Sequence, residues 1–259
     1  QHGPLRRPGR RAHPRDWRAV VRPFFSYYGA KYTVAKHLGP PRHDLVIEPF
    51  AGSVAYSTRW NVKHARLYDV SPDIVTLWDW LIRCSAADVE RIPDAFECME
   101  ELAGLSTGAR LLVQFWAAKG RCEATTALSP WYFAYRNDRN CRVWGPAVKR
   151  RVIAQKPLIA GWTVDLRSYA GIEDVEAHWH VDPPYNNAAG RRYPHSAIDF
   201  AHLAEWCHSR SGHVDVCENE GADWLPFTPL CEVVSSRGRR DGHRSAEAVW
   251  SRAIGGADV

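Results

Sequence analysis

The stretch DLVIEPFAG, residues 44–52, decides the fold class of this chain. Its apolar run stops at Pro49, which cannot donate to a sheet ladder, so residues 44–48 are predicted to be a short buried strand. A tight turn follows and leads into a helix expected over residues 54–60. Strand, turn and helix in this order are typical of the first unit of a parallel sheet covered by helices.

The residues that follow repeat this pattern. Residues 65–69 predict a second strand, which ends in Asp69. Ser71 and Pro72 then predict an N-cap and a first helical position, for a helix that continues to about Arg83. From about 85 to 155 the pattern is mostly helical. Further strands are expected at 177–182, 213–217, 230–235 and 246–252, with a helix over 200–209. The sequence therefore predicts an open α/β sheet interrupted by a helical insertion.

Composition excludes several classes of protein. The chain has 259 residues, 34 Lys+Arg against 29 Asp+Glu, and 45% hydrophobic residues, which is too apolar for a disordered chain. No apolar run reaches the roughly 18 residues of a membrane span, and the first 22 residues lack the apolar centre of a signal peptide. The seven cysteines include no Cys-x-x-Cys pair, which argues against structural zinc. We expect a cytoplasmic monomer with reduced thiols, no metal and no membrane partner.

The charge of +5 is concentrated in one place. Residues 1–22 hold seven arginines and a single acid, Asp16, so they account for the whole excess. Their glycines and prolines argue against a regular helix. This stretch is predicted to be a basic, flexible arm, which either holds nucleic-acid phosphates without reading sequence or has no function.

Two histidines, His178 and His180, flank Trp179 in an alternating stretch and could face one side of a strand as metal ligands do. A half-buried strand face is the commoner explanation of such a pair, and we predict no metal there.

Two features at the ends of the first strands indicate a nucleotide-type cofactor. The turn after Glu48 contains Gly52, which lets a ligand approach the backbone closely. Asp69 ends the second strand, where a carboxylate can accept both hydroxyls of a ribose. Each feature alone is weak, since tight turns and helix-capping acids are common, and the G-x-G-x-x-G fingerprint is absent.

The tetrapeptide Asp182-Pro183-Pro184-Tyr185 follows the strand expected at 177–181. Two prolines end that strand and place Asp182 and Tyr185 just beyond it, where open α/β sheets carry their chemistry.

With this motif the chain resembles the Dam-like, alpha-group DNA adenine-N6 methyltransferases. Four blocks carry the resemblance, namely SYYGAK at 26–31, EPFAG at 48–52, YDVSP at 68–72 and DPPY at 182–185. The resemblance extends from about Phe24 to Arg252. It departs from the family at Tyr27, where Trp is usual, and at Ala30, where Gly is usual. The family also usually has another Gly two residues after Gly52, whereas Ser53 and Val54 follow here.

The resemblance implies a Rossmann-like S-adenosylmethionine-dependent methyltransferase sheet. It implies a catalytic domain over 23–84 and 156–259, and a target-recognition region within the insertion at 85–155. The implied catalytic residues are Asp182, Pro183, Pro184 and Tyr185. The implied residues for S-adenosylmethionine are Tyr27, Gly29, Lys31, Glu48, Phe50, Gly52, Asp69 and Asp182. Tyr27 would cover the adenine or methionine part of the cofactor, and Lys31 would lie near its carboxylate.

The chemistry of methyl transfer to adenine fits these residue types. An exocyclic amine is a poor nucleophile, and acceptors for its two N–H groups favour a more nucleophilic nitrogen. The carboxylate of Asp182 and the carbonyl of Pro183 can supply them, and Tyr185 offers a ring for stacking. An adenine inside double-stranded DNA is out of reach, so it would have to flip out.

Basic residues outside the expected strands are candidates for contact with double-stranded DNA, although each patch could equally be a solvated face. They are Arg136, Arg139 and Arg142 in the insertion, Arg191 and Arg192 after the catalytic motif, and Arg239, Arg240 and Arg244 in an expected hairpin loop. We expect a site-specific DNA adenine-N6 methyltransferase of a restriction-modification or phage setting. The alternatives are transfer to cytosine-N4 or to an RNA adenine, and a catalytically inactive DNA-binding relative.

Overall fold

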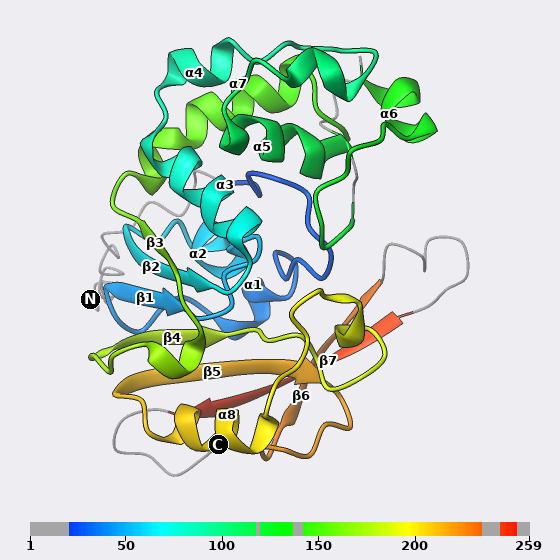
Figure 1. Cartoon of the computed structure of the whole chain (residues 1–259). Coiled ribbons are helices and arrows are strands. Elements are labelled where there is room, and N and C mark those ends of the chain that lie inside the picture. The colour runs from blue at the N-terminus through cyan, green and yellow to red at the C-terminus, as the bar shows by residue number, and fades with distance from the viewer. Residues whose placement is uncertain (1–20, 118–119, 137–141, 235–243, 253–259) are drawn as a thin grey trace, which may run out of the picture.

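The computed structural model describes residues 21–117, 120–136, 142–234 and 244–252 (Figure 1). Within these residues the centre is a seven-stranded sheet in the order β3-β2-β1-β4-β5-β7-β6. The strands are β1 (Leu45–Glu48), β2 (His64–Asp69), β3 (Thr163–Leu166), β4 (Ala177–Val181), β5 (Gly212–Asn219), β6 (Thr228–Val234) and β7 (Arg244–Arg252).

Helices cover both faces and one edge of this sheet. The α-helices are α1 (Ala35–Leu38), α2 (Ala55–Arg59), α3 (Pro72–Arg83), α4 (Ala86–Glu90), α5 (Thr107–Ala117), α6 (Pro130–Tyr135), α7 (Pro146–Gln155) and α8 (Phe200–His208). The short 3-10 helices are η1 (Met99–Leu102), η2 (Lys156–Ile159), η3 (Tyr169–Gly171) and η4 (Gly190–Arg192). None of the helices in the described ranges has the length and apolarity needed to cross a bilayer.

The first five strands are parallel, and the strand order reverses between β1 and β4. β7 then runs antiparallel to β5 and pairs with β6. This arrangement confirms the predicted fold class, a Rossmann-like α/β sheet of the methyltransferase type. Ligands of such sheets bind beyond the carboxyl ends of the strands at the point where the order reverses.

Alternate residues of the strands serve two separate cores. Val46 packs with Tyr56 and Trp78 under α2 and α3, whereas its neighbour Ile47 packs with Trp179 on the α8 side. Every residue of β4 is buried, which is expected for a central parallel strand with both faces covered.

The helix α3 shows why the chain folds this way locally. Its buried residues Ile74, Leu77, Trp78 and Leu81 recur at helical spacing and form one apolar stripe. Pro72 stands at the first helical position, as predicted. The side chain of Ser71, however, makes no capping bond. Its backbone N–H instead donates to Asp69, 2.9 Å away.

Two further details differ from the sequence prediction. The edge strand β3 was not predicted, because three of its four residues are exposed and it has no apolar alternation. At the other end, Val21 is buried, and the backbone of Arg22 is hydrogen-bonded in both directions to the side chain of Gln155. The last two residues of the predicted basic arm are therefore held by the body of the protein. Residues 1–20 lie outside the described residues.

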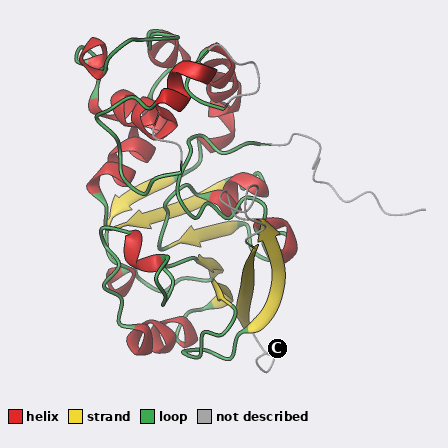
Figure 2. Ribbon diagram, turned by 90° about the vertical axis from the view of Figure 1, so that its right-hand side faces the viewer, coloured by secondary structure: helices red, strands yellow, loops and turns green. Residues whose placement is uncertain are grey.

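The helices α4 to α7 form a group beyond the β3 edge of the sheet, opposite the β6–β7 hairpin (Figures 1 and 2). This group joins the sheet through α3, which packs against both α5 and β3. The helical stretch agrees with the pattern predicted for 85–155, while the division of the chain into domains stays a prediction.

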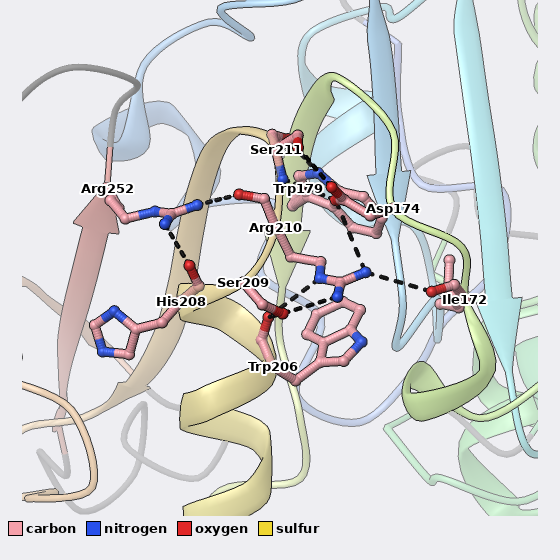
Figure 3. Close-up of polar contacts among 9 residues, drawn as sticks. All are labelled: Ile172, Asp174, Trp179, Trp206, His208, Ser209, Arg210, Ser211 and Arg252. Atoms are coloured by element: carbon pink, nitrogen blue, oxygen red, sulfur yellow. Dashed lines mark hydrogen bonds and ion pairs between the residues drawn. The ribbon is translucent and has the colours of Figure 1, made fainter.

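A guanidinium network locks the end of the sheet farthest from the strands' carboxyl ends (Figure 3). Arg210, just before β5, donates from Nε to the carbonyl of Trp206 (3.1 Å) and from Nη1 to that of Ile172 (3.4 Å). Its guanidinium also lies over the Trp206 ring, 4.6 Å from the centroid. Asp174 lies 3.8 Å from Nη1 and accepts from the backbone of Ser211. One side chain thus ties α8, η3 and the start of β5 together.

Replacing Arg210 by Met keeps the apolar stem but leaves these acceptors without their charged donor. We expect the free energy of unfolding to fall by about 2–4 kcal/mol, measured by urea denaturation. The control is Arg83→Met on α3, because Arg83 is 78% exposed and pairs only with Asp79 in the described contacts. It should shift the free energy by less than about 0.5 kcal/mol. Equal effects of the two variants would contradict the assigned role of Arg210.

Candidate active site

A cavity of about 1090 Å³ opens at the carboxyl ends of β1, β2, β4 and β5. The structure brings together around it all the residues assigned above to catalysis and to the cofactor. They are Tyr27, Gly29, Lys31, Glu48, Phe50, Gly52, Asp69, Asp182, Pro183, Pro184 and Tyr185. These residues come from four separate parts of the chain, so their convergence follows from the sheet order and not from sequence proximity. Their individual roles stay predictions.

The turn after β1 is fastened to the end of β2. Gly52 adopts φ +44°, and a Cβ there would come within 3.1 Å of the Tyr27 ring. Its N–H donates to Asp69 Oδ2 at 3.0 Å, while Ser71 N–H donates to Oδ1. Burial raises the pKa of Asp69, and these backbone donors oppose the shift. Each carboxylate oxygen keeps a lone pair for a further donor.

Val54, two positions beyond Gly52, lies in the left-handed region with φ 50° and ψ 52°. A β-branched residue is strained in this conformation. Val54 is nevertheless fully buried, and its N–H is bonded to the carbonyl of Ala51. Packing therefore holds Val54 in a left-handed backbone conformation that glycine would adopt without strain.

Glu48 ends β1 in a buried position at the wall of the cavity. Its Oε1 accepts from Ser57 N–H on α2 at 2.9 Å. Burial raises its pKa to about 8, with the bond to Ser57 opposing and the charge of Asp182 adding to the shift. The bond to Ser57 joins the end of β1 to α2.

Asp182 follows β4 and lines the cavity floor. Desolvation raises its pKa to about 7, the ammonium of Lys31 opposes the shift, and the carboxylates of Glu247 and Glu218 add to it. A carboxyl that titrates near neutrality in a cavity is a frequent property of a functional site.

Tyr185 is held by a pair of buried charges. Its hydroxyl donates to Glu247 Oε2 at 2.8 Å. The same oxygen lies 3.2 Å from Lys31 Nζ, and this ammonium lies over the Tyr185 ring, 4.2 Å from the centroid. Lys31 is thus engaged with Glu247 and Tyr185, and one face of the Tyr185 ring is covered.

The loop after the Asp182–Tyr185 motif also lines the cavity. Gly190 packs so closely on Tyr185 that a Cβ would lie 1.9 Å from its carbonyl oxygen, so no other residue fits there without a shift of the loop. Tyr193 then closes one side, and its hydroxyl donates to the carbonyl of Tyr28 at 3.0 Å. Glu218 of β5 accepts the N–H of Asn186 at 3.0 Å and anchors the start of this loop.

A buried cluster on β4 and β5 has the residue types of a metal site: His178, His213 and Asp215. His213 Nε2 lies 2.8 Å and His178 Nε2 3.3 Å from the Asp215 carboxylate. His178 Nδ1 accepts the N–H of Arg42, so in the neutral ring Nε2 carries the proton. A histidine that binds a metal usually donates from its other nitrogen instead. These contacts fit two imidazoles around one carboxylate, whose pKa they lower against the effect of burial.

The expectation that His178 and His180 lie on a half-buried strand face was wrong, because both side chains are fully buried. Both rings stack on Tyr56, at centroid distances of 4.9 and 4.5 Å.

The candidate DNA-binding arginines lie in different surroundings. Arg136 is bound to Glu97, 2.5 Å from Nη1 to Oε1, and Arg142 stacks on the Tyr135 ring. Arg244 pairs with Glu232 at 3.0 Å on the exposed β6–β7 hairpin. Arg191 and Arg192 are exposed on η4, and Arg192 donates to the Tyr28 hydroxyl beside the cavity. Arg139, Arg239 and Arg240 lie outside the described residues.

Sequence reasoning missed several residues that line this cavity, above all Glu247, Tyr193 and Val70. Val70 immediately follows Asp69 and is 41% exposed, which is unusual for a large apolar side chain next to a cavity. Its position after a strand-ending acid could have indicated it. Glu247 and Tyr193 carry no comparable signal.

No family model and no curated protein matches this sequence. Two solved structures share features of the fold at low similarity. The protein yhhF of Escherichia coli, a proposed methyltransferase, has 10% identity and a TM-score of 0.33, with 79% of this chain and 74% of that chain covered. HI0767 of Haemophilus influenzae, a proposed methylase, has 8% identity and a TM-score of 0.31, with 85% and 84% covered. Similarity at this level assigns no activity to this chain.

The raised pKa of Asp182 predicts an effect on stability. Between about pH 4, the unfolded value, and about pH 7, the native state binds more protons at this site than the unfolded state. This group therefore makes the protein less stable as pH rises through that window. Asp182→Asn should raise the free energy of unfolding by about 1–3 kcal/mol at pH 8, with the difference from wild type lost below about pH 4.

Urea denaturation at several pH values measures this difference. Asp165→Asn on the exposed strand β3 is the control and should change stability little at any pH. A gain in Asp182→Asn that does not depend on pH would show that the carboxylate's charge is not its cause.

Proposed function

We propose that this protein is a DNA adenine-N6 methyltransferase that uses S-adenosylmethionine. The observation that supports it best is that the Asp182–Tyr185 motif lines the same cavity as the Gly52 turn and Asp69. In a sheet of this type the two features are the expected positions of the acceptor amine and of the cofactor's nucleoside.

The residues around Asp69 suit a nucleoside. Asp69 is fixed by two backbone donors and keeps lone pairs for ribose hydroxyls. Phe50 and Val70 add apolar surface beside it for a flat base. Gly52 has a positive φ and no Cβ, so the Tyr27 ring packs directly on the turn that lines the cavity. S-adenosylmethionine, when bound, supplies a methyl group that its sulfonium charge has already activated.

The catalytic end of the cavity suits an amine as methyl acceptor. The carboxylate of Asp182 accepts a hydrogen bond from one N–H of the exocyclic amine, and the carbonyl of Pro183 accepts from the other. The bound cofactor would supply the methyl group to which the amine nitrogen would bond, and its sulfur would leave as a thioether with the electron pair of the carbon–sulfur bond. The methylated nitrogen loses a proton to Asp182, whose pKa near 7 allows it to pass the proton to water.

Double-stranded DNA is the proposed partner, with the target adenine flipped into the cavity. Arg191 and Arg192 are exposed on η4, in the loop that follows the Asp182–Tyr185 motif, and would contact phosphates beside the flipped base. Arg142 and Arg244 would contact DNA from the helical group and from the β6–β7 hairpin. Arg136 would first have to release Glu97.

Incubation of the protein with labelled S-adenosylmethionine and mixed-sequence DNA should yield N6-methyladenine, identified by mass spectrometry of the digested DNA. Asp182→Ala should lower the rate by about a thousandfold or more, since one acceptor of the amine and its charge are lost. The control variant Asp165→Asn should keep the wild-type rate.

The identity of the product separates the alternatives. N4-methylcytosine, or transfer only to RNA adenine, would keep the site and replace the acceptor. DNA binding without transfer to any acceptor would refute an enzyme and favour an inactive DNA-binding relative.

The pH dependence of transfer follows from the pKa of Asp182. Only its carboxylate form accepts from the amine, so kcat/KM should rise with pH up to an apparent pKa near 7 and then level off. In the complex the sulfonium charge favours the carboxylate, so the apparent pKa of kcat should be lower. Initial rates from pH 5 to 9 measure both values. A flat profile over this range would contradict the assigned role of Asp182.

A further inference from the structure

Glu247 occupies a place in the fold that a parallel strand could not give it. β7 runs antiparallel to β5, and Glu247 pairs in register with Asn219, the last residue of β5. The beginning of β7 therefore lies beside the carboxyl ends of the parallel strands. The side chain of Glu247 is buried and lines the cavity.

One oxygen of Glu247 serves two partners from distant parts of the chain. Oε2 accepts from the Tyr185 hydroxyl at 2.8 Å and lies 3.2 Å from Lys31 Nζ. Lys31 in turn lies 4.2 Å from the centre of the Tyr185 ring. The three groups form a closed set, in which each one fixes the other two. It joins the segment before α1, the catalytic loop and β7.

We propose that Glu247 is a positioning residue of this site, which fixes the ring of Tyr185 and the ammonium of Lys31 and thereby sets the acceptor end of the cavity. This inference rests on the proposed methyl transfer. With Lys31 over one face of the Tyr185 ring, a base would have to stack on the other face. Without Glu247 the hydroxyl loses its acceptor and the ammonium is free to move toward Asp182.

The charges around Asp182 give Glu247 a second effect. Asp182 is faced by Lys31 from the segment before α1, Glu48 from β1, Glu218 from β5 and Glu247 from β7, and by the Tyr185 hydroxyl of its own loop. Glu247 raises the pKa of Asp182, and Lys31 lowers it. Removal of the Glu247 charge should therefore shift the protonation of Asp182 to lower pH.

An ion pair that only stabilised the fold would not have to line the cavity, as the pair of Lys31 and Glu247 does. Such a pair stabilises a fold little compared with apolar residues of the same size. Here both charges line the cavity, and their shared partner belongs to the catalytic motif. A role in stability and a role in positioning predict different outcomes for an isosteric change.

The test compares methyl transfer by wild type, Glu247→Gln, Tyr185→Phe and the double variant, with Glu205→Gln on the exposed face of α8 as the matched control. Gln keeps the size of Glu247 and an acceptor for the hydroxyl but removes the charge. Tyr185→Phe keeps the ring but removes the hydroxyl. Thermal unfolding and calorimetric binding of S-adenosylmethionine show which variants remain folded and bind the cofactor.

We expect Glu247→Gln, which removes the ion pair that holds Lys31 over the ring, and Tyr185→Phe, which removes the hydroxyl bond, each to lower kcat by about tenfold. The double variant should lose less than about twofold more, because either change already disrupts the same set of contacts. In Glu247→Gln the apparent pKa of kcat/KM should fall by roughly half a unit or more. Glu205→Gln should keep the wild-type rate and pH profile.

If the wild type transfers methyl groups, two findings together would overturn the positioning role. The reductions in kcat of the single variants would multiply in the double variant, and the pH profile of Glu247→Gln would match that of the wild type. Unchanged kcat in Glu247→Gln would overturn it too. Methyl transfer by the wild type is measured first, and its absence would instead refute the proposed function. If Glu247→Gln does not fold, Tyr185→Phe alone still tests whether the hydroxyl bond sets kcat.

Discussion

The parallel pairing of β1 with β4 is the constraint on which the site depends. These two strands lie side by side at the point where the strand order reverses. The chain after β1 leads to α2 on one face of the sheet, and the chain after β4 leads to α8 on the other face. The turn after β1 contains Gly52, and the loop after β4 begins with Asp182. The cavity of about 1090 Å³ lies between them. Asp69, Asn219 and Glu247 reach this opening from neighbouring strands, whereas Tyr27 and Lys31 reach it from the segment before α1.

The cavity wall combines groups that would be unfavourable elsewhere in a protein. Asp182 and Glu48 titrate near neutrality because they are desolvated, and Lys31 shares its buried position with Glu247. Charges of both signs held in this way lower the stability of the fold but give a site its reactivity. The cores on both faces of the sheet and the Arg210 network at its opposite end supply stability.

Local sequence was sufficient for much of the fold because β1, β2, β4 and α3 carry their signals within a few residues. α3 has its apolar stripe and Pro72, and β4 ends at two prolines. The edge strand β3 has three exposed residues out of four and is fixed only by its pairing with β2, so no local pattern marks it. The catalytic motif was visible for the same local reason as β4. Glu247 was not, because it lies at the beginning of a strand whose direction only the tertiary structure determines.

Val54 shows that one left-handed position in the turn after β1 does not depend on glycine. The residue is β-branched, buried and left-handed, so neighbouring packing and the bond to Ala51 determine its backbone. A backbone held by its surroundings can accept substitutions that a sequence pattern built on glycine would exclude. The backbone conformation at this position thus depends on the contacts of the fold, and proteins with the same turn conformation need not have the same residue there.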